Sequence, residues 1–110
     1  LGVVSLLLGD FKGAREMFSH LVQHNQDRID YRMNLGVAFM NLGQRDSVLF
    51  QCRKILQVSP GHLGAYTLMG DVFQINGKSS QARQVYLEAL KQDEENSEIK
   101  ERLKALKVDP

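Results

Sequence analysis

The chain has 110 residues, of which 43% are hydrophobic and 25% are charged, values that are ordinary for a folded domain. Its formal net charge of +1 argues against nucleic-acid binding, which requires a basic surface. The single cysteine, Cys52, excludes an intrachain disulfide framework and a thiolate zinc cluster. No apolar run approaches the roughly 20 residues of a membrane-spanning helix, so we expect no direct membrane insertion.

The first predicted element is the apolar run LGVVSLLLG at 1–9. It is similar to the apolar core of a signal peptide, but it has no basic leader and no initiator methionine. We therefore expect it to be the second half of a helix, and the whole chain to be a fragment of a longer protein.

The following segments repeat at a fixed interval. LGVAFMNLG at 35–43 is matched by MGDVFQING at 69–77. Three glycines, Gly9, Gly43 and Gly77, fall in the same register. A fixed period of roughly this size, about 34 residues, indicates a solenoid, in which each repeat needs its neighbours to bury its apolar face.

Each repeat is predicted to be a helical hairpin, because apolar residues recur with a helical period on both sides of its second glycine. The stripes of the middle repeat are Leu35, Phe39 and Leu42, then Val48, Cys52, Ile55 and Leu56. The glycine between the stripes suits a helix C-cap, where a positive φ carries no side-chain penalty. Small residues such as Gly70 are expected to let two backbones approach closely.

The last predicted element is a helix at about 97–108. Ile99, Leu103 and Leu106 lie on one of its faces, and lysine or glutamate occupies most of the rest. The acidic run at 92–101 complements the dipole at the N-terminal end of this helix. We expect the helix to close the array and to keep it soluble.

These residues together resemble the tetratricopeptide repeat. The middle repeat shows Leu35-Gly36, Phe39, Gly43 and Pro60, and the third shows Tyr66, Met69-Gly70, Phe73, Gly77, Ala82, Tyr86 and Ala89. The resemblance implies an all-α, right-handed helical-hairpin solenoid of about three repeats, each of about 34 residues, the first truncated, plus a C-terminal capping helix. The expected divisions of this single domain, 1–110, are a partial repeat at 1–28, repeats at 29–62 and 63–96, and the capping helix at 97–110.

Three residues depart from the family pattern, namely Arg32, Val48 and Glu94. Arg32 stands where the family prefers a large aromatic residue. We expect this substitution to loosen the joint between the first two repeats.

The resemblance also implies that the first helix of each hairpin lines a concave groove. The expected peptide-binding residues are Val3, Leu6, Leu7, Met33, Val37, Met40, Asn41, Thr67, Asp71 and Gln74. The groove would therefore be apolar at its N-terminal end and polar at its C-terminal end. An apolar strip that contains methionine suits an amphipathic helix or a hydrophobic peptide, but upstream helices or a second copy of the chain would cover it equally well.

One function of the family is disfavoured by the groove residues. Repeats that bind the carboxylate tails of heat-shock chaperones use lysine, arginine and asparagine as a clamp. The corresponding residues here are Val3, Met33, Val37, Thr67 and Asp71. Asp71 would repel a carboxylate.

No constellation of residues indicates catalysis. His20 and His24 are one helical turn apart and could face one metal ion, but no third ligand is near, so a solvated helix face is the favoured interpretation. Cys52 lies on an inner stripe, which favours a buried side chain over a nucleophile. Neither a nucleotide loop nor a nucleophile elbow is present. We predict a protein that is no enzyme and has no catalytic, cofactor-binding or metal-binding residues.

The leading hypothesis is a non-catalytic protein–protein interaction scaffold that binds a peptide or helix of a partner, whose identity the sequence does not give. One alternative is a structural module that assembles into a homo-oligomer through an exposed edge or through the groove. Another is a regulatory segment of a larger enzyme. No sequence feature indicates a compartment, and the cytoplasm is only the default.

Overall fold

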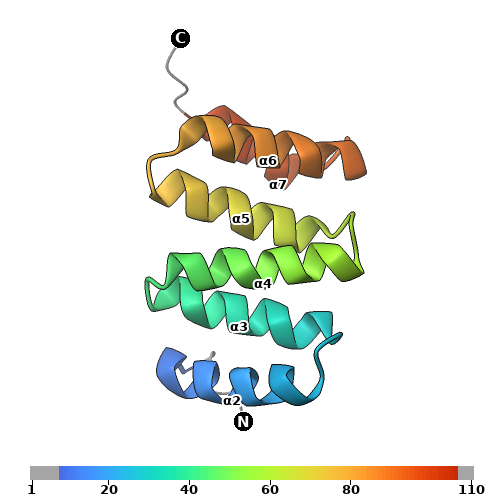
Figure 1. The fold of residues 1–110 in the computed structure, drawn as a ribbon. Helices are drawn as coiled ribbons and strands as arrows, with labels where there is room; N and C mark the ends of the chain where they lie inside the picture. The colour runs from blue at the N-terminus through green and yellow to red at the C-terminus, as the bar shows by residue number, and fades with distance from the viewer. Residues whose placement is uncertain (1–7, 107–110) are drawn as a thin grey trace. The chain divides into compact units, whose positions relative to one another are not determined.

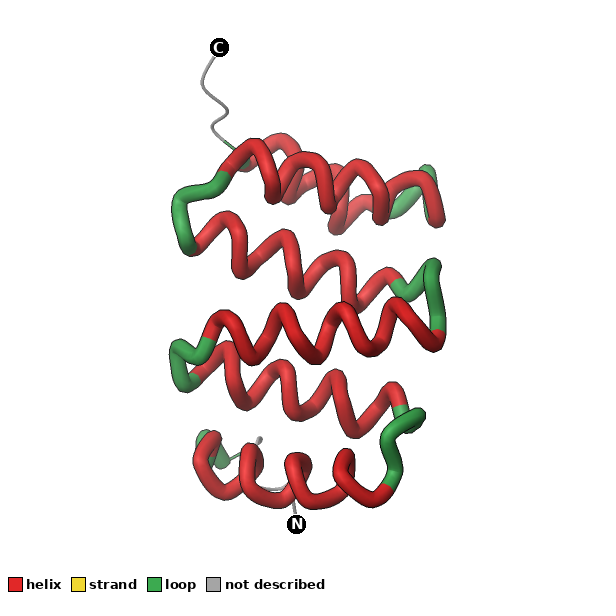
Figure 2. The backbone as a smooth tube through the Cα atoms, in the orientation of Figure 1, coloured by secondary structure: helices red, strands yellow, loops and turns green. Residues whose placement is uncertain are grey.

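The computed structural model describes residues 8–106, which form helices joined by short loops (Figures 1 and 2). The helices are α2 (Phe11–His24), α3 (Ile29–Asn41), α4 (Arg45–Val58), α5 (Leu63–Ile75), α6 (Ser79–Gln92) and α7 (Ser97–Ala105). No strand occurs within 8–106, so the all-α prediction is confirmed. The first seven residues, which include the predicted groove residues Val3, Leu6 and Leu7, lie outside the described part.

The chain divides into two compact units, Leu1–Pro60 and Gly61–Pro110. In the first unit, α3 contacts both α2 and α4 and lies between them (Figure 1). In the second unit, α6 contacts both α5 and α7. Each unit therefore contains one helical hairpin, α3–α4 or α5–α6, and one further helix packed against it.

Both hairpins turn at a glycine with left-handed backbone geometry. Gly43 and Gly77 each have a φ of 74°. The amide of Gln44 donates to the carbonyl of Phe39 at 2.9 Å, and the amide of Lys78 donates to that of Phe73 at 2.8 Å. These bonds satisfy carbonyls that a helix end leaves free. The predicted glycine caps are confirmed.

The first unit has a core built from the facing sides of α2 and α3. The buried cluster consists of Ala14, Phe18, Val22, Leu35 and Ala38. On α4, the side chains of Val48, Cys52 and Ile55 are fully buried. The apolar stripes predicted from the helical period are therefore the faces that the helices bury.

The second unit has a core that joins α6 to α7. Ala82, Tyr86, Ala89 and Ile99 form its buried cluster, and Leu103 and Leu106 pack against it. The predicted apolar face of the last helix is thus confirmed. Asn96 caps this helix, because its side-chain oxygen accepts from the amide of Ile99 at 3.0 Å.

The close approach at Gly70 differs from the prediction. A Cβ atom at this position would overlap the ring of Tyr86, which is fully buried. The glycine therefore admits an aromatic side chain, where the sequence suggested a second backbone. This contact explains glycine in a helix interior despite a cost of about 1 kcal/mol relative to alanine.

Replacing Gly70 tests this packing. Gly70→Ala is expected to lower the free energy of unfolding by roughly 1–2 kcal/mol, because overpacking by about 1–3 kcal/mol outweighs the gain in helix propensity. Urea unfolding followed by circular dichroism measures the change. In a Tyr86→Leu background the same substitution should be neutral or stabilising. An equal loss in both backgrounds would show that the Tyr86 ring is not the cause.

Candidate functional site

Four of the predicted groove residues lie together on α3. Met33, Val37 and Met40 share one face, since positions i, i+4 and i+7 recur at nearly the same angle around a helix. All three are partly exposed, and Asn41 beside them is exposed. The Asn41 side-chain amide donates to the Val37 carbonyl at 2.9 Å. The first unit therefore presents a small apolar strip that ends in an amide.

The corresponding residues of α5 are engaged within the second unit. The Thr67 hydroxyl donates to the Leu63 carbonyl at 2.9 Å. The Asp71 carboxylate accepts two bonds from Arg102, from Nε at 2.9 Å and from Nη2 at 3.2 Å. It also accepts a bond from the Tyr86 hydroxyl. Asp71 thus ties α5 to both α6 and α7.

Arg102 forms the centre of this polar network. Its Nη1 atom also donates to Glu98 at 2.6 Å. The hydrogen bond to Asp71 is the largest influence that raises the pKa of Arg102, burial opposes it, and Glu98 adds to the increase. The pKa of Tyr86 is raised by burial first and then by the bond to Asp71.

The pairing with Arg102 changes how Asp71 must be interpreted. The sequence alone suggests a free carboxylate at this position that repels an acidic ligand. In the structure a guanidinium partly neutralises that charge, so Asp71 is a weaker argument against a carboxylate ligand than expected. Sequence reasoning missed Arg102 because it lies on another helix, far from Asp71 in the chain, where no helical period connects them.

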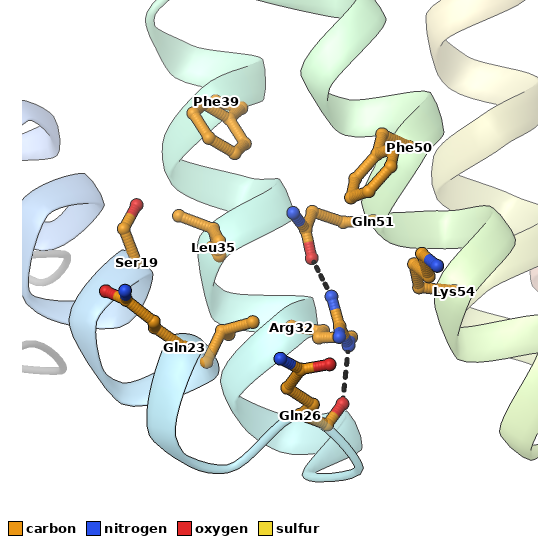
Figure 3. A pocket seen from close by; sticks show the side chains of 10 residues that line it. Ser19, Gln23, Gln26, Arg32, Leu35, Phe39, Phe50, Gln51 and Lys54 are labelled. Carbon is orange, nitrogen blue, oxygen red and sulfur yellow. Dashed lines mark hydrogen bonds between the residues drawn. The ribbon is translucent and has the colours of Figure 1, made fainter.

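A cavity lies elsewhere, on the opposite face of α3. It is a pocket of about 440 Å³ in the first unit, open to solvent (Figure 3). Its lining residues are Ser19, Val22, Gln23, Gln26, Arg32, Leu35, Phe39, Phe50, Gln51 and Lys54. At about 100° per residue, Leu35 and Phe39 point away from the strip of Met33, Val37 and Met40. None of the predicted groove residues lines this pocket.

A buried polar pair forms the floor of the pocket. Arg32 and Gln51 are only 6% and 7% exposed. Arg32 Nη1 donates to Gln51 Oε1 at 2.9 Å, and its Nε donates to the Gln26 carbonyl at 2.8 Å (Figure 3). A buried guanidinium is tolerated only when such bonds replace its hydration.

These bonds correct the expectation for Arg32. It was expected to loosen the joint between the first two repeats, yet it binds the loop after α2 and the side chain of α4 at once. Gln51 supplies an acceptor for the guanidinium that stands in place of the aromatic residue. The signal available in the sequence was a polar residue on the inner face of each of two neighbouring helices, Arg32 on α3 and Gln51 on α4.

The residues suspected of chemistry occupy ordinary positions. Cys52 is fully buried, as predicted, and burial raises the pKa of its thiol to about 12. The rings of His20 and His24 lie with centroids 4.7 Å apart on the exposed side of α2. Within 8–106 no group of three or more histidine, cysteine or acidic residues is placed to hold a metal.

The comparisons with known proteins agree on the architecture. Residues 63–96 match the model of the tetratricopeptide repeat. The structure of YrrB, described as a tetratricopeptide protein with an unusual peptide-binding site, matches with a TM-score of 0.91, covering 94% of this chain and 54% of that chain at 22% identity. Residues 63–96 therefore form a tetratricopeptide repeat, and the described helices have the fold of tetratricopeptide proteins.

Three further proteins give matches of similar extent on this chain. The second such domain of human RPAP3, solved in complex with an HSP70 peptide, has a TM-score of 0.88 and 16% identity, covering 98% of this chain and 90% of that chain. BBSome complex member BBS4 of Bos taurus is 30% identical over 93 residues, 84% of this chain and 18% of the relative. The small glutamine-rich tetratricopeptide repeat-containing protein 2 of Mycosarcoma maydis is 26% identical over 98 residues, 89% of this chain and 28% of the relative. The chain thus spans under a third of these two relatives.

The solenoid fold class of the family is therefore confirmed for this chain, and the division into repeats at 1–28, 29–62 and 63–96 stays a prediction. No helix within 8–106 combines the length and the apolar character needed to cross a bilayer.

A double-mutant cycle tests the pair of Arg32 and Gln51. Gln51→Leu is expected to lower the free energy of unfolding by about 1–3 kcal/mol, because a buried guanidinium loses its acceptor. Arg32→Leu combined with Gln51→Leu should cost less than the sum of the two single changes. Urea unfolding measures all three, and Arg53→Ala on the exposed side of α4 is the control, with a change within about 0.5 kcal/mol. Strict additivity would contradict the coupling.

The reactivity of Cys52 tests its burial. With the pKa of the Cys52 thiol raised from 9.0 to about 12, the folded chain at pH 9 should react with a thiol reagent about 500-fold more slowly than the unfolded chain, in which about half of the thiol is ionised. The raised pKa also means that the stability which this group contributes is complete below pH 9 and is lost as the pH rises toward 12. Absorbance of the released thiolate follows the reaction, and Cys52→Ala gives the blank. Similar rates in native buffer and in urea would show that the thiol is accessible.

Proposed function

We propose that this chain is a non-catalytic protein-interaction module that binds a peptide or helix of a partner protein on the exposed apolar strip of α3. The observation that carries the proposal is the strip of Met33, Val37 and Met40. These three apolar side chains stay partly exposed while the other side of α3 supplies the core. Contiguous exposed apolar surface on a folded domain marks a binding site more often than scattered single residues do.

The chemistry of the strip favours an apolar ligand. Methionine side chains are flexible and polarisable, so they adapt to ligands of different shape. An amphipathic helix that lies in a groove uses apolar anchors spaced like those of α3. Asn41 at the end of the strip offers a polar contact that can fix the register of the ligand. In the repeat register Val3, Leu6 and Leu7 hold the equivalent positions of the first repeat, and we include them in the proposed site.

The equivalent positions on α5 are included in the proposal by their place in the repeat register alone, and they are polar. Thr67, Asp71 and Gln74 occupy them, and Asp71 is already paired with Arg102. None of these three residues is a lysine or arginine of the clamp type that would bind a carboxylate, so an apolar segment remains the favoured class.

The relatives support the general class of function. The RPAP3 domain was solved with a bound peptide, and YrrB is described as having a peptide-binding site. BBS4 is named as a member of a multiprotein complex. Protein binding is thus the common element among these similar proteins.

Charge insertion into the strip tests the proposal. Val37→Glu with Met40→Glu should reduce capture of partner proteins from a native extract by about tenfold or more, because two carboxylates must then be desolvated against an apolar ligand. Captured proteins are identified by mass spectrometry, and helicity and mass are verified for each variant. Gln57→Glu with Gln84→Glu, on exposed positions of α4 and α6, adds the same charge and should capture normally.

Two outcomes would contradict the strip as the site. If both double variants capture the same partner equally, the ligand binds another surface. If the unaltered chain captures nothing and its mass remains above 12.5 kDa on dilution, self-association is the better description of the strip.

A further inference from the structure

We infer that the pocket formed by α2, α3 and α4 is a second protein-binding site, which takes an apolar side chain of a partner segment together with an adjacent carboxylate. This site lies on the side of α3 that faces away from the strip of Met33, Val37 and Met40. It therefore stands independently of the function proposed for that strip.

The buried pair of Arg32 and Gln51 gives the pocket a directed hydrogen-bond donor. A guanidinium only donates hydrogen bonds, so the Gln51 atom that faces Arg32 must be its amide oxygen. The amide nitrogen of Gln51 consequently points the other way, toward the space between Phe39 and Phe50 (Figure 3). Because Arg32 is itself held by the Gln26 carbonyl, this donor is fixed before any ligand arrives. A carbonyl or carboxylate oxygen is the group that such a donor binds.

The walls of the pocket provide an apolar surface beside that donor. Phe39 and Leu35 line one side and Phe50 lines the other (Figure 3). Phe50 is 52% exposed, so a large part of its ring is accessible to a ligand. A volume of about 440 Å³ accommodates a large apolar side chain and a neighbouring group, and it falls within the usual range of ligand pockets.

The charge of the lining selects the second part of the ligand. The ten lining residues include two cations, Arg32 and Lys54, and no carboxylate. Lys54 lies with Nζ 5.5 Å from the centroid of the Phe50 ring. No ion pair found within 8–106 uses Lys54. A cation at the rim of an apolar pocket that has no acidic neighbour in its lining attracts an anion on the ligand.

These features specify a protein segment with an aromatic or aliphatic residue next to glutamate or aspartate. The apolar side chain fills the space between Phe39 and Phe50, and its backbone carbonyl or the carboxylate accepts from the Gln51 amide. The carboxylate also meets Lys54. A purely apolar ligand would leave the Gln51 donor unsatisfied, which is costly in a partly buried site.

Matched peptides test the inference by nuclear magnetic resonance. The probes are capped hexapeptides that carry Phe-Glu, Phe-Gln or Ala-Glu between glycine and serine residues. Titration of the Phe-Glu peptide should shift the side-chain amide signals of Gln51 and the backbone signals around Phe50. The Phe-Glu peptide should bind at least about threefold more tightly than either matched peptide.

Variants of exposed residues assign the two parts of the ligand. Lys54→Glu should abolish the preference for Phe-Glu over Phe-Gln, whereas Arg53→Glu, an exposed neighbour outside the lining, should preserve it. Phe50→Ser should weaken binding of the Phe-Glu peptide by about fivefold or more. Leu87→Ser on α6, which removes a 38% exposed apolar residue of the other unit, should leave binding unchanged.

The inference is overturned by any of three results. The first is that the Gln51 and Phe50 signals do not respond to the Phe-Glu peptide at millimolar concentration. The second is that the Phe-Glu and Phe-Gln peptides bind equally. The third is that the pocket signals shift with protein concentration alone and the mass doubles from 12.5 kDa, which would make a second copy of the chain the occupant. The Val37→Glu and Met40→Glu variant alters the other face of α3, so it should bind the Phe-Glu peptide normally.

Discussion

The tight turns at Gly43 and Gly77 are the constraint on which the rest of each hairpin depends. A positive φ at one residue, with the same amide-to-carbonyl bond beside it, reverses the chain between α3 and α4 and between α5 and α6. Since no atom lies within 4 Å of a Cβ added at either glycine, the backbone conformation alone selects the residue type. The reversal fixes which side of the first helix its partner covers. All other surfaces of α3 and α5 are defined by that choice.

Two faces of α3 differ in character. One face carries Met33, Val37 and Met40, which are apolar and adaptable. The other forms the floor of the pocket, where Arg32 and Gln51 create a fixed polar contact within an apolar setting. A single helix can therefore support two kinds of recognition, one tolerant of ligand shape and one dependent on an oriented donor. Neighbouring residues in the sequence serve opposite surfaces.

The sequence predicted what depends on local periodicity and could not predict what depends on distant pairs. The helices, the glycine caps and the buried stripe with Val48, Cys52 and Ile55 follow from the helical period and from the period of the repeat. The bond between Arg32 and Gln51 and the bond between Asp71 and Arg102 each join residues of different helices. The number of residues between the partners matches neither the helical period nor the repeat period in either case, so no sequence pattern connects them. Arg32 consequently appeared as an isolated departure from the family pattern, and Asp71 appeared as a free carboxylate.

The repeat register shows why these polar residues occur in pairs. Shifting Arg32 and Gln51 forward by one repeat gives Tyr66 and Val85, so both polar side chains are replaced together by residues with larger apolar surface.

The same relation holds in the other direction. Shifting Asp71 and Tyr86 back by one repeat gives Val37 and Cys52, and their hydroxyl–carboxylate bond is absent because neither group is present. A buried polar group without its partner lowers the free energy of unfolding more than a complete polar pair or an apolar pair does at the same positions. At these positions each polar residue therefore occurs together with its hydrogen-bond partner. Val37 is apolar in one repeat, while Asp71 at the same position in the next is bonded to Tyr86 and Arg102.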